Sequence, residues 1–206
     1  MHPNPVFHDA DAAQNLDFAR SRAFGVLAVS TDEAPLISHV PFLLSEDGTY
    51  ADLHLVRSNP IVRALTKPHP ARLAVSGPDG YISPDWYGID EQVPTWNYIA
   101  VHLTGRLERL PDEDLRGLLD RQSAFYEARL LPKPPWSSAK MDGAALARLM
   151  RMILPVRLGI TGVDGTWKLS QNKPETARLA AAEAVNGGFG AQLADLSVLM
   201  QAAKAQ

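Results

Sequence analysis

The sequence predicts a mainly β protein of the α+β class, with about six to seven mostly antiparallel strands, flanking helices and a helical C-terminus. Short runs alternate apolar and polar residues, turn residues separate those runs, and apolar residues at helical spacing appear mainly later in the chain. The chain has 206 residues, of which 46% are hydrophobic. Because that length can bury one sizeable core, we expect a single domain over residues 1–206, with a C-terminal helical extension over residues 187–206.

The first strands are predicted where β-forming residues alternate between turns. Residues 24–30 and 36–45 form a predicted hairpin, and residues 50–56 form a third strand. Pro41 interrupts the second strand and cannot donate to a ladder, which places it at an edge, a bulge or a barrel corner. Residues 72–77 form a fourth strand, which we expect to end in a Gly-Pro-Asp-Gly turn.

An aromatic stretch, residues 81–106, follows that turn and holds two of the four Trp and three of the five Tyr. Its second half alternates, which predicts a half-buried strand from Tyr98 with Ile99, Val101, Leu103 and Leu107 on its inner face. Its first half has turn residues, and we expect residues 94–97 to be loop. Such a loop suits a flat ligand, and the alternative is a loop that folds its aromatic residues onto the core.

Helices are predicted at several places in the chain. Residues 11–21 form a short helix, Asp112 caps an amphipathic helix that covers the sheet, and residues 146–153 carry a second short amphipathic pattern. Residues 156–170 are predicted to form a hairpin with its turn at Asp164 and Gly165. Two Ala-rich helices end the chain, and the glycines between them are expected to cap and link these helices.

One candidate anion site lies at the predicted turn from the third strand into a helix. Asn59 is the expected N-cap and Pro60 the first helical residue. Free N–H groups at a helix start, the Ser58 hydroxyl and the Arg57 guanidinium are groups that bind a phosphate ester. The alternative is an ordinary capped helix with a surface arginine.

A second candidate anion site, near the C-terminus, has the same strand-to-helix turn pattern. A strand ends in polar residues and Pro174 opens a helix. The alternative is a solvated turn with surface lysines. The candidate binding residues here are Lys168, Ser170, Gln171, Asn172 and Lys173.

Composition and missing motifs exclude several functions. A net charge of −3 and a pI near 6.1 argue against nucleic-acid binding, and the absence of cysteine excludes thiolate chemistry. No leader or membrane-spanning pattern is present, so we expect a cytoplasmic protein without membrane attachment. His39, His54 and His102 lie in predicted strands, but nothing in their spacing supports a metal site. No catalytic acid can be named among Asp85, Asp90 and Glu91.

An aromatic loop together with two anion-friendly turns indicates a planar ring joined to a phosphate. A mononucleotide cofactor has this chemistry, and flavin mononucleotide (FMN) is its obvious member.

The same residues resemble a known family. Segments LISHVPFLL, HLVRSNP, YISPDWY, VPTWNYIAVHLTGRL and GTWKLSQNK, in this order and spacing, look like the PaiB-like FMN-binding negative transcriptional regulators, with the match running from about Phe7 to about Leu179. The resemblance implies a flavin-binding split β-barrel related to the pyridoxamine-phosphate oxidase group. It also implies a homodimer with flavin at the subunit interface.

The resemblance assigns candidate flavin contacts residue by residue. It places the family's PTWNY stretch on Pro94, Thr95, Trp96, Asn97 and Tyr98, its strand-to-helix anion turn on Arg57, Ser58 and Asn59, and its KLSQNK stretch on Lys168 through Lys173. The family more often has Ala at the position of Ser58. Beyond about Gly187 this sequence departs from the family pattern, and nothing is transferred there.

Three functional hypotheses follow from the sequence. The first is an FMN-binding homodimeric regulator or sensor. The second is an FMN-dependent oxidoreductase that uses a reduced nicotinamide or a small substrate, with catalytic residues unknown and enzymatic activity left open. The third, direct DNA binding, is the weakest, because the chain is acidic and its candidate basic surfaces are Arg148, Arg151 and Arg157, or Arg116, Arg121 and Arg129.

Overall fold

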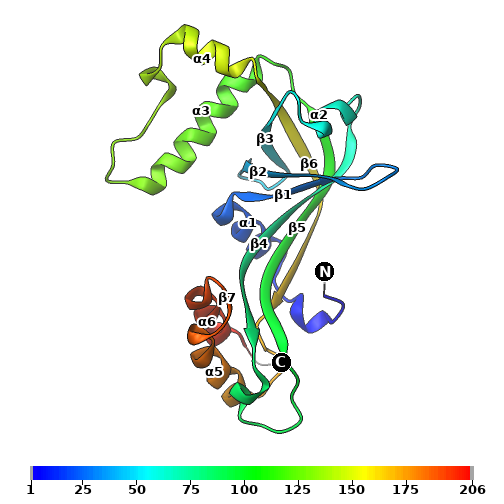
Figure 1. Ribbon diagram of the computed structural model, residues 1–206, viewed down its shortest axis with the longest axis vertical. Coiled ribbons are helices and arrows are strands. Elements are labelled where there is room, and N and C mark those ends of the chain that lie inside the picture. Colours follow the sequence, from blue (N-terminus) through cyan, green and yellow to red (C-terminus); the bar gives the residue numbers. More distant parts are fainter. Residues whose placement is uncertain (1, 205–206) are drawn as a thin grey trace. The chain divides into compact units, whose positions relative to one another are not determined.

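The computed structural model describes residues 2–204 and contains seven strands and six α-helices within them (Figure 1). The strands are β1 (Phe24–Val29), β2 (Leu36–Leu44), β3 (Tyr50–Val56), β4 (His69–Ile82), β5 (Thr95–Arg109), β6 (Ile153–Lys168) and β7 (Gly190–Ala191). The α-helices are α1 (Ala12–Arg22), α2 (Pro60–Ala64), α3 (Asp114–Glu127), α4 (Gly143–Met150), α5 (Glu175–Ala184) and α6 (Leu193–Ala202).

The strands form an antiparallel barrel of the split-barrel type. Their order is β1-β2-β3-β6-β5-β4-β7, and an additional pairing between β1 and β4 closes the first six strands on themselves. β7 pairs antiparallel with β4, with Asp79 opposite Ala191 and Gly80 opposite Gly190. The predicted mainly β, α+β fold with six to seven strands and a helical C-terminus is therefore confirmed.

The chain divides into two compact units. Unit 1 comprises the residues up to Phe18, Val75–His102 and the residues from Asp164 on, whereas unit 2 comprises Ala19–Ala74 and Leu103–Val163. Strands β4, β5 and β6 contribute residues to both units. The single-domain assignment and the C-terminal extension remain predictions.

Unit 2 has a barrel core of buried aliphatic side chains. Inward positions of β1, β2, β3, β4, β5 and β6 are almost fully buried, and α3 adds Leu115 and Leu118. Pro41 lies where β2 changes partner: residues 36–41 pair with β1, and residues 42–44 pair with β3. A residue without an N–H is tolerated at such a change of partner, which agrees with the predicted edge, bulge or barrel corner.

Unit 1 has a separate core beneath its helices. α5 and α6 lie side by side in Figure 1 and bury small and aliphatic residues against β4 and β5. Ile82, Ile99, Ala181, Val185 and Met200 form the centre of this core. The core holds α5 and α6 on the segments of β4 and β5 that contain the aromatic stretch.

Two predicted turns are instead parts of continuous strands. β4 runs through Gly77 and Pro78, and its alternation of buried residues shifts by one position there, as it does at a β-bulge. β6 runs through Asp164 and Gly165, so the predicted hairpin is wrong. A Cβ on Gly165 would lie 2.0 Å from the Asn15 side-chain oxygen, which shows that this glycine permits close packing rather than a turn.

One local prediction fails at another element, and a second is incomplete. Asp112 does not cap α3: the N-cap position is Glu113, while the Asp112 carboxylate accepts hydrogen bonds from Arg57 and Arg109. Sequence spacing could not reveal these arginine partners. The glycine-rich segment between α5 and α6 is more than a linker, because Gly190 and Ala191 form β7.

Candidate functional site

The start of β5 places the motif residues on two opposite faces of one strand. The prediction that residues 94–97 are loop holds for Pro94 but is wrong for residues 95–97, because β5 begins at Thr95. Asn97 therefore joins Ile99 and Val101 on the buried face, whereas Trp96 points outward and is 41% exposed. One flat ligand lying on the outer face can reach Trp96 and Tyr98 but not the buried Asn97.

A buried polar network compensates for Asn97 in the core. The Asn97 amide nitrogen donates to the Ser170 hydroxyl at 2.8 Å, and the Tyr87 and Ser170 hydroxyls lie 2.8 Å apart. Asn97 also approaches the sulfur of Met200 at 3.4 Å, while its side-chain oxygen has no hydrogen-bond partner among the described residues. The burial penalty foreseen for Asn97 is thus offset by Ser170 rather than avoided by a loop.

The turn after β6 folds its polar residues inward. Ser170 adopts a left-handed backbone conformation, with φ of 63°, and is buried together with Gln171. The Gln171 side chain accepts from the Leu169 N–H at 2.8 Å and donates to the Trp167 carbonyl at 2.6 Å. Asn172 is exposed. Ser170 and Gln171 therefore hold the turn in shape, and Asn172 faces solvent.

Two lysines lie beside this turn. Lys168 donates to the Thr95 hydroxyl, and Lys173 donates to the Gln92 side chain. Partial burial lowers the pKa of Lys168 below its usual value, and the positive charge of Lys173 lowers it further. A negatively charged group near these two ammonium groups would relieve their repulsion, so the pair is suited to an anion.

A shallow groove of about 330 Å³ lies on the outer face of β4 and β5 in unit 1. Its walls include Trp96, Tyr98, Ser76, Gly77 and Asp79. A Cβ on Gly77 would lie 2.6 Å from the Phe18 ring, so this glycine permits close packing on the core side of β4. The groove volume is at the lower end for small-molecule sites. The aromatic wall formed by Trp96 and Tyr98 fits a planar ring.

The other candidate turn lies in unit 2. Asn59 caps α2 as predicted, accepting from the Ile61 N–H at 2.9 Å. Arg57 and Ser58 are exposed. Arg57 donates to the Asp112 carboxylate and to the Arg151 carbonyl, each at 2.8 Å. A phosphate at this turn would compete with Asp112 for the Arg57 guanidinium.

The sequence interpretation missed two residues that shape the unit 1 site. Tyr87 was part of a quoted motif, but its bond to Ser170 depends on tertiary packing. Phe189 is 73% exposed and contacts Trp96 edge to face at 5.9 Å between ring centroids. In the sequence, Phe189 is a single aromatic residue flanked by glycines, and this pattern could have marked it as a candidate site residue.

The three strand histidines do not form a metal centre. His54 contacts the Gln122 side-chain oxygen at 3.1 Å, and burial lowers the pKa of its imidazole. Within residues 2–204, no group of three or more His, Asp or Glu residues could hold a metal ion.

Comparison with known proteins assigns the family. Residues 1–162 match the family described as "Putative FMN-binding domain". The chain belongs to this family. The expected cofactor, FMN or a related flavin, is thereby confirmed at the level of the family, and the PaiB-like resemblance is confirmed as well. The matched range ends before Lys168, so the second turn lies outside it.

A relative of similar length and two solved structures of similar fold were found. The chain is 26% identical over 203 residues to "Protease synthase and sporulation protein PAI 2" of Bacillus subtilis, covering 98% of this chain and 97% of that protein. The FAD and heme binding protein from Mycobacterium smegmatis has a similar fold, with a TM-score of 0.58, 18% identity and coverage of 89% and 82%. The flavocytochrome Anf3 from Azotobacter vinelandii gives a TM-score of 0.54 at 16% identity, with coverage of 81% and 72%.

No helix among the described residues has the length and apolar character needed to cross a membrane. A cytoplasmic location stays a prediction.

Proposed function

We propose that this protein is an FMN-binding homodimer that acts as a flavin-dependent regulator or sensor, as the PaiB-like resemblance implies. The observation that carries the proposal is the family match over residues 1–162. Bound flavin supplies redox chemistry and a visible absorption band, while the protein supplies binding and orientation.

In this proposal the outer face of β5 receives the flavin ring. Trp96 and Tyr98 provide aromatic surface there. The phosphate binds at Arg57 and Ser58, whose polar groups are exposed at the start of α2.

In a homodimer, the aromatic groove and the two anion turns can all contribute to flavin binding. Trp96 and Tyr98 lie on the opposite face of β5 from Asn97. Lys168 donates a hydrogen bond to Thr95, and Lys173 donates one to Gln92. Two chains can offer different faces to one flavin, so the two anion turns serve a shared site from opposite subunits. Size-exclusion chromatography with light scattering tests this arrangement, and a monomer at high concentration contradicts it.

The first experiment is an FMN titration of the full chain followed by flavin fluorescence. We expect Trp96→Ala to weaken FMN binding by about 1–3 kcal/mol if Trp96 stacks on the ring. Trp136→Ala is the matched control, because Trp136 is 37% exposed and lies in unit 2, outside the groove. If Trp96→Ala lowers thermal stability while FMN affinity per folded molecule is unchanged, Trp96 serves packing and the ring site is misplaced.

A second candidate function is an FMN-dependent oxidoreductase that uses a reduced nicotinamide or a small substrate. The lowered pKa of Lys168 favours it, since a partly buried ammonium releases a proton more readily than a solvated one. Anaerobic mixing of the FMN-loaded protein with NADH or NADPH separates the candidates. Rapid loss of flavin colour supports the enzyme, and persistent colour supports the sensor.

Direct DNA binding receives little support from the arginine side chains. Arg157 pairs with Asp52, Arg116 pairs with Asp120, and Arg129 donates to the carbonyls of Ser21 and Arg20. Paired arginines offer less positive charge to phosphates. We expect no sequence-selective mobility shift at physiological salt, and a shift at nanomolar protein contradicts this expectation.

A further inference from the structure

A cleft in unit 2 lies apart from the residues assigned to flavin. It has a volume of about 610 Å³ and lies between the turn that joins β2 to β3 and the helix α3. Its size is within the range of small-molecule sites in proteins. None of the residues that line it belongs to the Arg57 turn, the Trp96 groove or the Lys168 turn.

One wall of the cleft is apolar and rigid. Leu43, Leu44, Phe125 and the ring of Tyr50 line it. The Tyr50 ring is fixed from one side by Arg157, whose guanidinium carbon lies 3.7 Å from the ring centroid. Phe125 is fixed similarly by Arg129 at 4.2 Å. Cation–π contacts of this kind reduce the motion of the two rings, so the wall is preorganised for an apolar ligand body.

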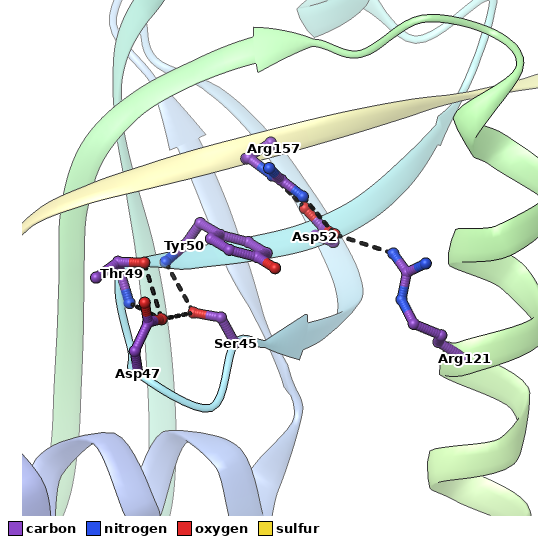
Figure 2. Close-up of polar contacts among 7 residues, drawn as sticks. All are labelled: Ser45, Asp47, Thr49, Tyr50, Asp52, Arg121 and Arg157. Carbon is purple, nitrogen blue, oxygen red and sulfur yellow. Dashed lines mark hydrogen bonds and ion pairs between the residues drawn. The ribbon is translucent and has the colours of Figure 1, made fainter.

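The positive charge at the inner end exceeds what the buried carboxylate needs. Asp52 is 2% exposed and already forms two hydrogen bonds with Arg157, at 2.7 and 2.9 Å. Arg121 approaches the same carboxylate from α3 at 3.3 Å, and its side chain is 58% exposed (Figure 2). Two guanidinium groups thus meet one buried carboxylate, so the Arg157 pair satisfies Asp52 without Arg121.

Arg121 is the more exposed of the two arginine partners of Asp52. A second cavity of about 420 Å³ shares Tyr50, Asp52 and Arg121 with the cleft, so the Arg121 side chain lies at the junction of both spaces. Its polar contact among the described residues is the single long one with Asp52. The Arg121 guanidinium can therefore turn toward a ligand while Arg157 continues to neutralise Asp52.

The outer end of the cleft carries charges of both signs. The Asp47 carboxylate accepts hydrogen bonds from Ser45 and Thr49, and these bonds lower its pKa and keep it ionised. Glu46 is exposed beside it. Figure 2 shows this turn and the Asp52 cluster at two ends of the region around Tyr50. Arg20 also lines this end, where its guanidinium donates to the Ser45 and Glu46 carbonyls. The Arg20 guanidinium is thus engaged by the turn and lies beside two carboxylates, whereas Arg121 at the inner end has one polar contact among the described residues, with Asp52.

We propose that this cleft is a second binding site, for a small organic carboxylate with an apolar body. The carboxylate pairs with Arg121, and the apolar body packs against Leu43, Tyr50 and Phe125. Such a site gives the protein an input that is separate from flavin.

The test uses the full chain, with benzoate as the probe and benzamide as its neutral counterpart, in isothermal titration calorimetry. We expect benzoate to bind saturably and about tenfold or more tightly than benzamide, because only benzoate forms a charge-assisted pair. Arg121→Gln should weaken benzoate binding by about the same factor and leave benzamide unchanged. Arg116→Gln is the matched control on α3, since Arg116 pairs with Asp120 and Ser138 instead.

A second variant covers the case in which Arg121→Gln does not fold. Leu43→Trp places a large ring in the cleft and should abolish benzoate binding while thermal unfolding remains cooperative. The proposal is overturned if benzoate does not bind saturably, if benzamide binds equally well, or if Arg121→Gln binds benzoate normally. Loss of benzoate binding when FMN is saturating also overturns it, because the probe then occupies the flavin site.

Discussion

The two strand-to-helix turns, residues 57–59 and residues 168–173, both place polar residues ahead of a proline in the sequence. In the structure their polar residues lie in opposite environments. In the first turn, Arg57 and Ser58 remain exposed and Asn59 caps α2. In the second turn, Ser170 and Gln171 are 2% and 7% exposed and bond inward. The difference in exposure comes from the residue that precedes each turn. β3 ends at the exposed Val56, whereas Leu169, directly after β6, is buried in the unit 1 core. Polar residues ahead of a proline predict a turn, but packing decides which way their donors face.

The largest expected effect concerns which turn binds the FMN phosphate. We expect Arg57→Ala and Lys168→Ala each to weaken FMN binding by about 1.5–3 kcal/mol, because each removes a charge-assisted bond. Riboflavin is the control ligand, since it lacks the phosphate and its affinity should not change. Fluorescence titration measures both ligands. If both variants bind FMN as the unaltered protein does, neither turn holds the phosphate.

The next effect is a difference in stability between variants of Ser170 and Ser58, which lie in the two turns. Ser170→Ala leaves the Tyr87 hydroxyl and the Asn97 amide without their buried partner, so we expect a loss of about 1–3 kcal/mol of unfolding free energy. Ser58→Ala, at the exposed position, should change it by less than about 0.5 kcal/mol. Urea unfolding measures both variants. Equal stabilities would show that the buried network contributes nothing specific.

A smaller difference is expected between the two asparagines. Asn59→Ala removes the side-chain cap of α2 and should cost about 1 kcal/mol of unfolding free energy. Asn172→Ala, at an exposed position without a capping bond to α5, should cost less than about 0.5 kcal/mol. The reverse order in urea unfolding would contradict the assignment of caps.

The smallest effect is a pH dependence that belongs to the second turn. The pKa of Lys168 is lower in the folded protein than its usual value of 10.5. Between those two pKa values the unfolded chain binds more protons, so this residue makes stability rise with pH below 10.5. Lys168→Met should flatten that rise in urea unfolding at a series of alkaline pH values. Identical slopes in the variant and the unaltered protein would refute the contribution of Lys168.

The sequence by itself determined the fold class and most elements, because period-two alternation, turn residues and helix caps are local signals. The bounds of β3 and the Asn59 cap of α2 follow from neighbouring residues alone. The inner face of β5, with Ile99, Val101 and Leu103, was likewise predictable from alternation.

Tertiary structure decided what the glycines and the polar site residues do. Gly77 and Gly165 have turn-like neighbours, yet both lie in continuous strands because Phe18 and Asn15 pack against them. Asn97 is in the core because Ser170, 73 residues later in the chain, supplies its partner. Partners that are distant in sequence leave no periodic signal, so the faces of the candidate site became visible only when these side chains were packed together.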